Sequence, residues 1–303
     1  MKNVFAAVAA VSVGLSLQQA PQAPPRTEVY LASLSSGTAP AAAGPLVNIS
    51  QSPGYDNQPS YTPDGRSVLF TSDRVDRQTD IFRYDMSSTS LTRLTHDPEN
   101  EYSPLVMPGG RTFSVVHGDE QSLWSYDLDG SNGHLLYQHK GKIGYHVWID
   151  ATHVGIFVLG GESAPNTLQI ADVKGGEIVP IASSIGRSLL IRPNRGTVTF
   201  IDKARQGHWL VKDLDPGTRA ISTLVETPAG SEDCAWDSKT GLLLMASGTT
   251  IFGWSPSNSA AGWTKVGDLA GEGVSNITRL AVNPVVSAEA AGRLALVAEP
   301  AAR

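Results

Sequence analysis

The sequence predicts an all-β fold, a six-bladed β-propeller built from four-stranded blades. Three observations support this prediction. A pattern of short strands and tight turns recurs along the 303-residue chain. The aspartates that close the third strand of successive units, Asp85, Asp127, Asp172 and Asp213, lie 42, 45 and 41 positions apart. The two chain ends hold complementary halves of one further unit. A four-stranded repeat of roughly forty to fifty residues is typical of a propeller blade, whereas a β-sandwich does not repeat one pattern at a fixed long period.

The clearest unit begins at Asn57. Pro63-Asp64-Gly65 predicts a tight turn, because Pro presets φ, Asp bonds the nearby backbone and Gly tolerates positive φ. Residues 68–72 form a short apolar strand, and residues 80–85 alternate in polarity with the period of two that marks a half-buried strand. With the strands expected on either side, the unit supplies four short strands joined by hairpin turns.

Four further units repeat this pattern with decreasing fidelity. Each has a first strand that leads into a turn, a second apolar strand and a third strand with alternating polarity. Their first three strands fall within residues 104–127, 147–172, 191–213 and 234–254.

The sixth unit is split between the ends of the chain. Residues 277–284 and 293–298 supply two strands before the sequence stops, while residues 28–34 and 45–49 resemble a third and a fourth strand without a unit of their own. We expect these N-terminal strands to close the last blade, which removes edges that would otherwise remain unpaired. The prediction is one propeller domain over residues 27–300.

Residues 1–20 are predicted to be a signal peptide. Lys2 precedes an almost uncharged apolar run from Val4 to Leu17. That length suits a signal peptide and falls short of the roughly 20 residues that a membrane-spanning helix needs. Small residues place the cleavage between positions 16 and 23, and an uncleaved membrane anchor is the alternative. The mature chain is expected in the periplasm or outside the cell, without stable membrane insertion.

Composition narrows the function classes. Apolar residues make up 41% of the chain, enough for a packed core. The formal net charge is −6, and a surface that follows nucleic-acid phosphates needs clustered Lys and Arg, so nucleic acid is not an expected partner. Cys234 is the one cysteine in the sequence, which excludes an internal disulfide.

Residues 57–95 resemble the repeat of the TolB-like propellers. That repeat runs from Pro, through an aromatic residue, to Pro-Asp-Gly-Arg or Pro-Asp-Gly-Lys. An apolar strand ending in Ser-Asp-Arg follows, and the repeat closes with Asp-Ile-aromatic and Leu-Thr. The matching residues are Pro59, Tyr61, Thr62, Pro63, Asp64, Gly65, Arg66, Ser72, Asp73, Arg74, Asp80, Ile81, Phe82, Leu94 and Thr95. The match is specific in the first unit, fair in the second and loose afterwards.

Departures from the family limit what the resemblance implies about function. The TolB proteins carry an α/β domain before the propeller, whereas about 25 residues precede the first strand predicted here. A role in the Tol–Pal envelope system is therefore not carried over. Prolyl oligopeptidases also bear such propellers, but the Gly-x-Ser-x-Gly elbow of their hydrolase domain does not occur in this sequence. An isolated propeller is expected, and a fold alone does not give a function.

Candidate ligand-binding residues lie in the loops that lead into the innermost strands, because these loops line the mouth of the central channel. Carboxylates, amides, aromatic rings and an arginine can together grip a sugar, a peptide or a loop of a partner protein. The candidates are Tyr55, Asp56, Asn57, Asn100, Glu101, Tyr102, Tyr145, His146, Arg187, Glu232, Asp233 and Asn276.

The leading hypothesis is a non-catalytic, monomeric binding module for an envelope protein or polysaccharide, with no catalytic residues and no cofactor. The alternative is a metal-assisted polysaccharide lyase or lactonase. Related propeller lyases use a His-rich metal site in the channel, and here His146 with Glu101 and Asp233 would hold Ca, Mn or Zn. No histidine pair has the spacing of a zinc motif such as His-Glu-x-x-His. A third possibility is a propeller with no defined ligand.

Overall fold

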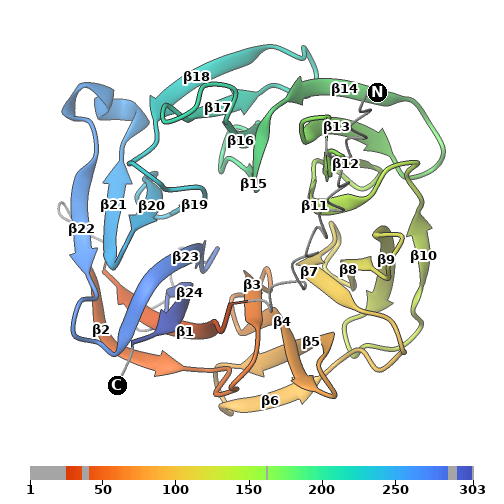
Figure 1. Cartoon of the computed structure of the whole chain (residues 1–303), viewed down its shortest axis with the longest axis horizontal. Coiled ribbons are helices and arrows are strands. Elements are labelled where there is room, and N and C mark those ends of the chain that lie inside the picture. Colours follow the sequence, from red (N-terminus) through yellow and green to blue (C-terminus); the bar gives the residue numbers. More distant parts are fainter. Residues whose placement is uncertain (1–24, 36–40, 162, 286–291, 302–303) are drawn as a thin grey trace, which may run out of the picture.

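A computed structural model describes residues 25–35, 41–161, 163–285 and 292–301. These residues form six four-stranded antiparallel sheets, and Figure 1 shows the sheets arranged as blades around a central axis. The strand nearest the axis in each blade is one of β3, β7, β11, β15, β19 and β23. The predicted six-bladed β-propeller is confirmed.

Five blades are continuous in sequence. The first three contain β3 (Asp56–Tyr61), β4 (Ser67–Val75), β5 (Gln78–Asp85) and β6 (Ser90–Arg93); β7 (Glu101–Val106), β8 (Thr112–His117), β9 (Ser122–Asp127) and β10 (His134–Tyr137); and β11 (Ile143–Trp148), β12 (His153–Val158), β13 (Thr167–Asp172) and β14 (Ile178–Ser183). The next two contain β15 (Ile185–Ile191), β16 (Val198–Asp202), β17 (Leu210–Leu214) and β18 (Ile221–Glu226); and β19 (Cys234–Trp236), β20 (Leu243–Ser247), β21 (Thr250–Trp254) and β22 (Thr264–Asp268). One short 3-10 helix, η1 (Pro256–Ala261), joins β21 to β22.

The sixth blade combines both ends of the chain. Its strands, from the axis outward, are β23 (Val274–Val282), β24 (Leu294–Pro300), β1 (Glu28–Leu34) and β2 (Ala42–Asn48). β1 pairs antiparallel with β24, so that Val29 faces Val297 and Leu31 faces Ala295. The prediction that the N-terminal strands close the last blade is confirmed.

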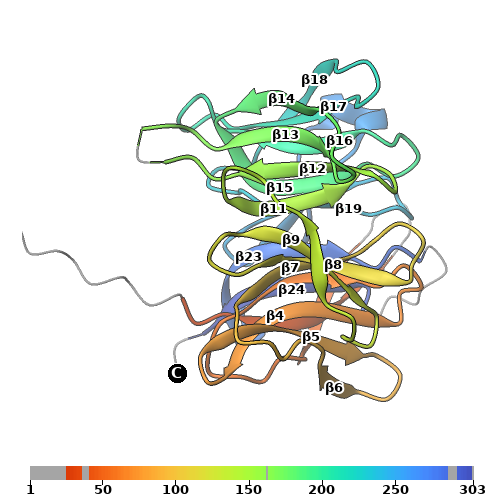
Figure 2. The ribbon, with the colours of Figure 1, turned by 90° about the vertical axis from the view of Figure 1, so that its right-hand side faces the viewer.

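The core lies in layers between adjacent blades. Because side chains alternate across a strand, Val68 and Phe70 of β4 pack toward the sixth blade with Val297, while Leu69 between them packs toward the second blade with Phe113. The same arrangement continues around the ring, and the side view in Figure 2 shows the blades packed against one another. The period of two in the sequence therefore reports burial on both faces of a blade, with each face covered by a different neighbour.

The predicted turn between β3 and β4 shows how local chemistry sets the blade. Asp64 Oδ1 accepts hydrogen bonds from the Thr62 hydroxyl (2.6 Å) and the Arg66 N–H (3.1 Å). Gly65 has φ +68°, a conformation that glycine adopts without steric cost. Its carbonyl accepts from Asn283 Nδ2 at 2.8 Å. The turn therefore links the first blade to the sixth.

Five of the six innermost strands contain an irregularity that shifts the pairing register. The shifts fall between Asn57 and Ser60, Tyr102 and Leu105, Ile143 and Tyr145, Ile185 and Leu189, and Ser275 and Arg279. Bulges of this kind bend a strand and turn a side chain to a new direction. They decide which side chains face the channel.

The predicted signal peptide, residues 1–20, lies outside the described residues. Across the ranges that the structure covers, no helix is long and apolar enough to cross a membrane.

Candidate functional site

The loops that precede the innermost strands meet at one mouth of the channel. A cavity of about 340 Å³ opens there against the first three blades. Four of the predicted residues line it: Tyr55, Asn100, Tyr102 and Tyr145. Their aromatic rings, with amide and hydroxyl groups, make this part of the mouth suited to a polar ligand with flat surfaces.

The centre of the mouth is organised by Arg279, which was not among the predicted residues. Its guanidinium donates to Asn57 Oδ1 through Nε (2.6 Å) and to the Tyr145 hydroxyl through Nη2 (2.8 Å). Nη1 lies 3.5 Å from Asp233 Oδ2. The guanidinium carbon also lies 4.9 Å from the centre of the Tyr145 ring. One arginine of β23 thus ties together groups from the first, third and fifth blades.

Asp233 is the acidic partner in this network. Its Oδ1 accepts the Leu280 N–H at 2.9 Å, while Oδ2 faces Arg279. Burial raises the pKa of Asp233, and the nearby charges of Arg279 and Arg187 oppose that effect. The pair is buried, and removing one partner of a buried pair leaves an uncompensated charge. The arrangement holds the Arg279 side chain in one position.

Arg187 lies beside this network. Its Nη2 donates to the Thr278 carbonyl at 2.9 Å. Its Nε has no hydrogen-bond partner among the described residues. Arg187 lines a deep channel cavity of about 310 Å³ and a smaller one of about 110 Å³ beside Glu232 and Asn276. It is therefore a cationic donor with unused hydrogen-bonding capacity in the channel.

The deep cavity lies below the mouth and continues along the channel. Residues of all six innermost strands or their leading loops line it, and many of them are apolar, such as Leu105, Val147 and Leu190. The channel thus changes from a polar mouth to a more apolar interior, an arrangement typical of binding pockets.

Besides Asn57, three predicted residues are buried and do not line the mouth cavity. Asp56 is fully buried and pairs with Arg74 at 3.1 Å. Glu101 is fully buried beside Asp97 and His117. His146 is 3% exposed, and its Nε2 lies 2.7 Å from the Ser114 hydroxyl. It lines the cavity of about 310 Å³ and not the mouth cavity. The two remaining loop residues have other partners: Glu232 pairs with Lys203 at 2.9 Å, and Asn276 donates to Glu299 Oε1 at 2.7 Å.

The channel metal site considered as an alternative is not assembled. His146 is bonded to Ser114, Asp233 faces Arg279, and Glu101 belongs to a different group. The His, Cys, Asp and Glu cluster present in the described ranges is Asp97, Glu101 and His117, between the first and second blades. Burial, reinforced by Asp97, raises the pKa of Glu101 to about 9.

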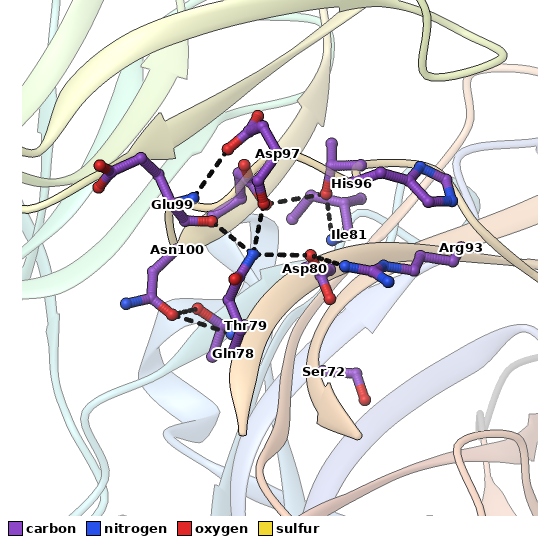
Figure 3. A network of polar contacts seen from close by, with 12 residues as sticks. Ser72, Gln78, Thr79, Asp80, Ile81, Arg93, His96, Asp97, Glu99 and Asn100 are labelled. Atoms are coloured by element: carbon purple, nitrogen blue, oxygen red, sulfur yellow. Dashed lines mark hydrogen bonds and ion pairs between the residues drawn. The ribbon is translucent and has the colours of Figure 1, made fainter. Parts of the chain in front are cut away.

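A hydrogen-bonded loop surrounds this cluster on the side of the first blade. Gln78 Nε2 donates to the carbonyls of Asp97 (2.6 Å) and Glu99 (2.9 Å) and to Asp80 Oδ1 (3.2 Å), as Figure 3 shows. Asn100 Oδ1 accepts the Thr79 N–H at 2.9 Å. The loop between β6 and β7 is therefore fixed to the first blade directly beside the mouth.

His146 makes stability depend on pH. Burial lowers the pKa of His146 to about 3, whereas in the unfolded chain it is about 6.5. Between these values the unfolded state binds more protons, so the free energy of unfolding falls as the pH drops through that window, with a slope approaching about 1.4 kcal/mol per pH unit.

A His146→Gln variant should lose most of that slope, because its side chain does not titrate. Chemical denaturation of both proteins from pH 7 to pH 4 measures the difference. Glu101 is present in both proteins, so its titration cancels in the comparison. Parallel pH profiles for the two proteins would show that His146 is protonated without cost in the folded state.

Comparison with known proteins finds one short match in sequence and several matches in fold. No protein-family model matches it. A segment of 48 residues is 42% identical to the Tol-Pal system protein TolB of Bordetella pertussis, covering 16% of this chain and 10% of that protein. The match therefore spans about a tenth of the length of the curated relative.

Solved structures resemble the chain over most of its length, at sequence identities that show the fold alone. The putative TolB from Agrobacterium tumefaciens superposes with a TM-score of 0.65 at 10% sequence identity, and the superposition covers 91% of this chain and 99% of that protein's chain. A chain of a nidogen/laminin complex has TM-score 0.63 at 10% identity, over 84% and 97%. An oligogalacturonate lyase in complex with manganese has TM-score 0.53 at 13% identity, over 92% and 99%. The chain is a six-bladed β-propeller, and its fold is similar to that of the putative TolB from Agrobacterium tumefaciens.

Proposed function

We propose that this propeller is an exported, non-catalytic binding module that recognises a protein or an envelope polysaccharide at the channel mouth. The observation that carries the proposal is the Arg279 network. Asn57, Tyr145 and Asp233, from three different blades, hold one guanidinium in place. Polar groups fixed before a ligand arrives lose little conformational entropy when it binds.

The mouth offers the chemistry that such ligands need. Tyr55, Tyr102 and Tyr145 line the mouth cavity, and aromatic side chains of this kind can pack against peptide side chains or sugar rings. Arg187 supplies a cationic donor for a carboxylate, which proteins and acidic polysaccharides contain. The nidogen/laminin structure is a propeller engaged with a protein. The proposal includes residues 1–20 as a cleaved signal peptide, a monomeric domain over residues 27–300, and ligand binding that needs no cofactor.

A second candidate is a polysaccharide lyase, favoured by the likeness to the manganese-bound oligogalacturonate lyase. Arg187 and Arg279 would then contact uronate carboxylates. The channel supports the lyase reaction less well, because the buried His146 bonds to Ser114 through Nε2. Its Nδ1 has no hydrogen-bond partner in the part of the chain that the structure describes. The likeness of the two folds is the main support for this candidate.

Arg187→Ala is expected to weaken ligand binding by about 30-fold, the loss typical of a central interface residue worth about 2 kcal/mol. The ligand is first captured from envelope extract on immobilised wild-type protein and identified, and dissociation constants are then measured for each variant. Arg195→Ala is the matched control, because Arg195 is exposed in the turn between β15 and β16 of the same blade.

Equal loss of affinity in both arginine variants would contradict a site at the mouth. Incubation of the wild-type protein with oligogalacturonate and Mn²⁺ tests the second candidate. Formation of an unsaturated uronate product that disappears in Arg187→Ala would replace the binding module by the lyase.

A further inference from the structure

Three side chains with metal-binding atoms meet at the boundary of the first and second blades. Asp97 lies in the loop before β7, Glu101 is the first residue of β7, and His117 is the last residue of β8. Their ligand atoms all lie within 4.8 Å of one another. His117 Nε2 is 3.2 Å from Asp97 Oδ1 and 3.6 Å from Glu101 Oε1.

These separations suit a small tetrahedral cation. Zn²⁺ binds imidazole nitrogen and carboxylate oxygen at about 2.0–2.2 Å, and two such ligands at a tetrahedral angle are about 3.4 Å apart. The distances of 3.2 Å and 3.6 Å bracket that value. Both separations from His117 therefore suit one shared ion, and the two carboxylate oxygens lie within 4.8 Å of each other.

Each carboxylate is anchored through the oxygen that faces away from His117. The Tyr126 hydroxyl donates to Asp97 Oδ2 at 2.6 Å, and the Thr95 hydroxyl donates to Glu101 Oε2 at 2.9 Å. The other oxygen of each carboxylate faces His117. The His117 ring is itself fixed by stacking on Trp124, with ring centres 4.0 Å apart. Anchoring of the ligands by a second set of groups is characteristic of metal sites in proteins.

Glu101 Oε1 provides an independent indication of a missing ligand. The Glu101 side chain is fully buried, and Oε1 has no hydrogen-bond partner among the described residues. A buried carboxylate oxygen without a partner is costly. It points toward His117, at the centre of the cluster.

In the first blade an arginine supplies the positive charge at the same position. Asp56 pairs in register with Ser72 there, just as Glu101 pairs with His117 in the second blade. In the first blade Arg74, two residues after Ser72, neutralises Asp56 at 3.1 Å. The residue two positions after His117 is Asp119. The second blade thus replaces the arginine by another acid and adds an imidazole.

We propose that Asp97, Glu101 and His117 bind one divalent transition-metal ion of the Zn²⁺ or Mn²⁺ class. A mixture of imidazole and carboxylates suits these ions. The Asp97 side chain is 31% exposed, whereas those of Glu101 and His117 are 0% and 9% exposed. Asp97 thus leaves a path for the ion and room for a water ligand. The site is separate from the Arg279 network and does not depend on the proposed function.

A bound ion would stiffen the side of the mouth that the second blade provides. Glu101 lies between Asn100 and Tyr102, both of which line the mouth cavity. The Asn100 carbonyl accepts the Gly118 N–H at 2.8 Å, directly after His117. The ion would join the two strands from which these residues project.

Metal binding is measured on the full chain after removal of metals with a chelator. Zn²⁺, Mn²⁺, Co²⁺, Ca²⁺ and Mg²⁺ are titrated separately, with metal content, thermal unfolding and tryptophan fluorescence as readouts. We expect one equivalent of Zn²⁺ or Mn²⁺ to remain after desalting. At a hundredfold excess over the dissociation constant, the melting temperature should rise by about 5 °C. Co²⁺ should show ligand-field absorption, and Trp124 fluorescence should change because this ring stacks on His117.

Glu101→Gln and His117→Gln are expected to weaken metal binding by at least about 100-fold, since loss of an outer group alone costs 10–100-fold. His153→Gln is the matched control, because His153 pairs with Asp150 at 2.9 Å on the surface. If either cluster variant unfolds, Thr95→Val tests the site through the anchor of Glu101. No retained ion and no change in melting temperature with any ion would show that a proton alone fills the cluster. Equal metal binding by wild type and Glu101→Gln would also overturn the proposal.

Discussion

Deleting residues 27–49 is expected to abolish cooperative folding of the whole domain. These residues contain β1 and β2, the two outer strands of the sixth blade. In β1, Val29, Leu31 and Leu34 are buried, and burial of each such side chain contributes about 1.5–3 kcal/mol. The deletion also leaves β24 with an unpaired edge, which is a site for aggregation. These three side chains alone amount to about 4.5–9 kcal/mol, which is comparable to the net stability of a typical domain, about 5–15 kcal/mol.

The deletion is compared with a chain that begins at residue 25, which keeps both strands. Circular dichroism during heating and size-exclusion chromatography should show one cooperative transition for the control and none for the deletion. An unchanged melting temperature in the deletion variant would overturn this expectation. It would show that the sixth blade is stable with two strands and that the pairing of β1 with β24 is not needed for stability.

Arg293→Met is expected to destabilise the protein by about 3–5 kcal/mol, the cost of leaving one member of a buried ion pair alone. The Arg293 side chain is 1% exposed, as is that of its partner Asp237, and the two are joined at 2.6 Å. Arg293 also donates to the Leu34 carbonyl at 3.0 Å. It therefore connects the fifth blade to both segments of the sixth.

A double-mutant comparison separates the charge from the packing. In Arg293→Met with Asp237→Asn, no buried charge is left unpaired, and Asn can still accept from the N–H of Lys239, as Asp237 does at 3.1 Å. We expect the single variant to melt roughly 10 °C lower and the double variant to recover part of that loss. Arg195→Met, in an exposed turn, is the control. A double variant no more stable than the single one would show that packing, not charge, sets the cost.

The fold could be predicted because its signals are local. The turn at Pro63-Asp64-Gly65 depends on residues adjacent in sequence, and Asp85, Asp127 and Asp172 each close the third strand of a blade, as the repeat predicted. The split blade could also be found, because the strands missing at one chain end are present at the other. Because the unit is repeated, each of these local signals recurs in several blades and supports the same prediction each time.

The site could be predicted only in part, because bulges change the direction of its side chains. A shift of one residue in a strand moves a side chain to the other face. The shift between Ser275 and Arg279 brings Arg279 to the channel, where the sequence suggested Asn276. The Asp97 cluster was also missed as a unit, because Glu101 and His117 meet only when β7 pairs with β8, and Asp97 joins them from the loop before β7. The sequence named Asp233, Tyr145 and Asn57 as candidates but not Arg279, which contacts all three.

The pairing of β1 with β24 also constrains the order of events during synthesis. β1 is among the first strands to leave the ribosome, and its partner β24 is the last. Contacts between residues so distant along the chain form slowly, because the intervening loop must first close. The five continuous blades can assemble before β24 is made, and until then the edge of β1 that pairs with β24 remains unpaired. An incomplete chain therefore cannot close its ring, so that premature termination yields a product open to degradation and not a smaller stable domain.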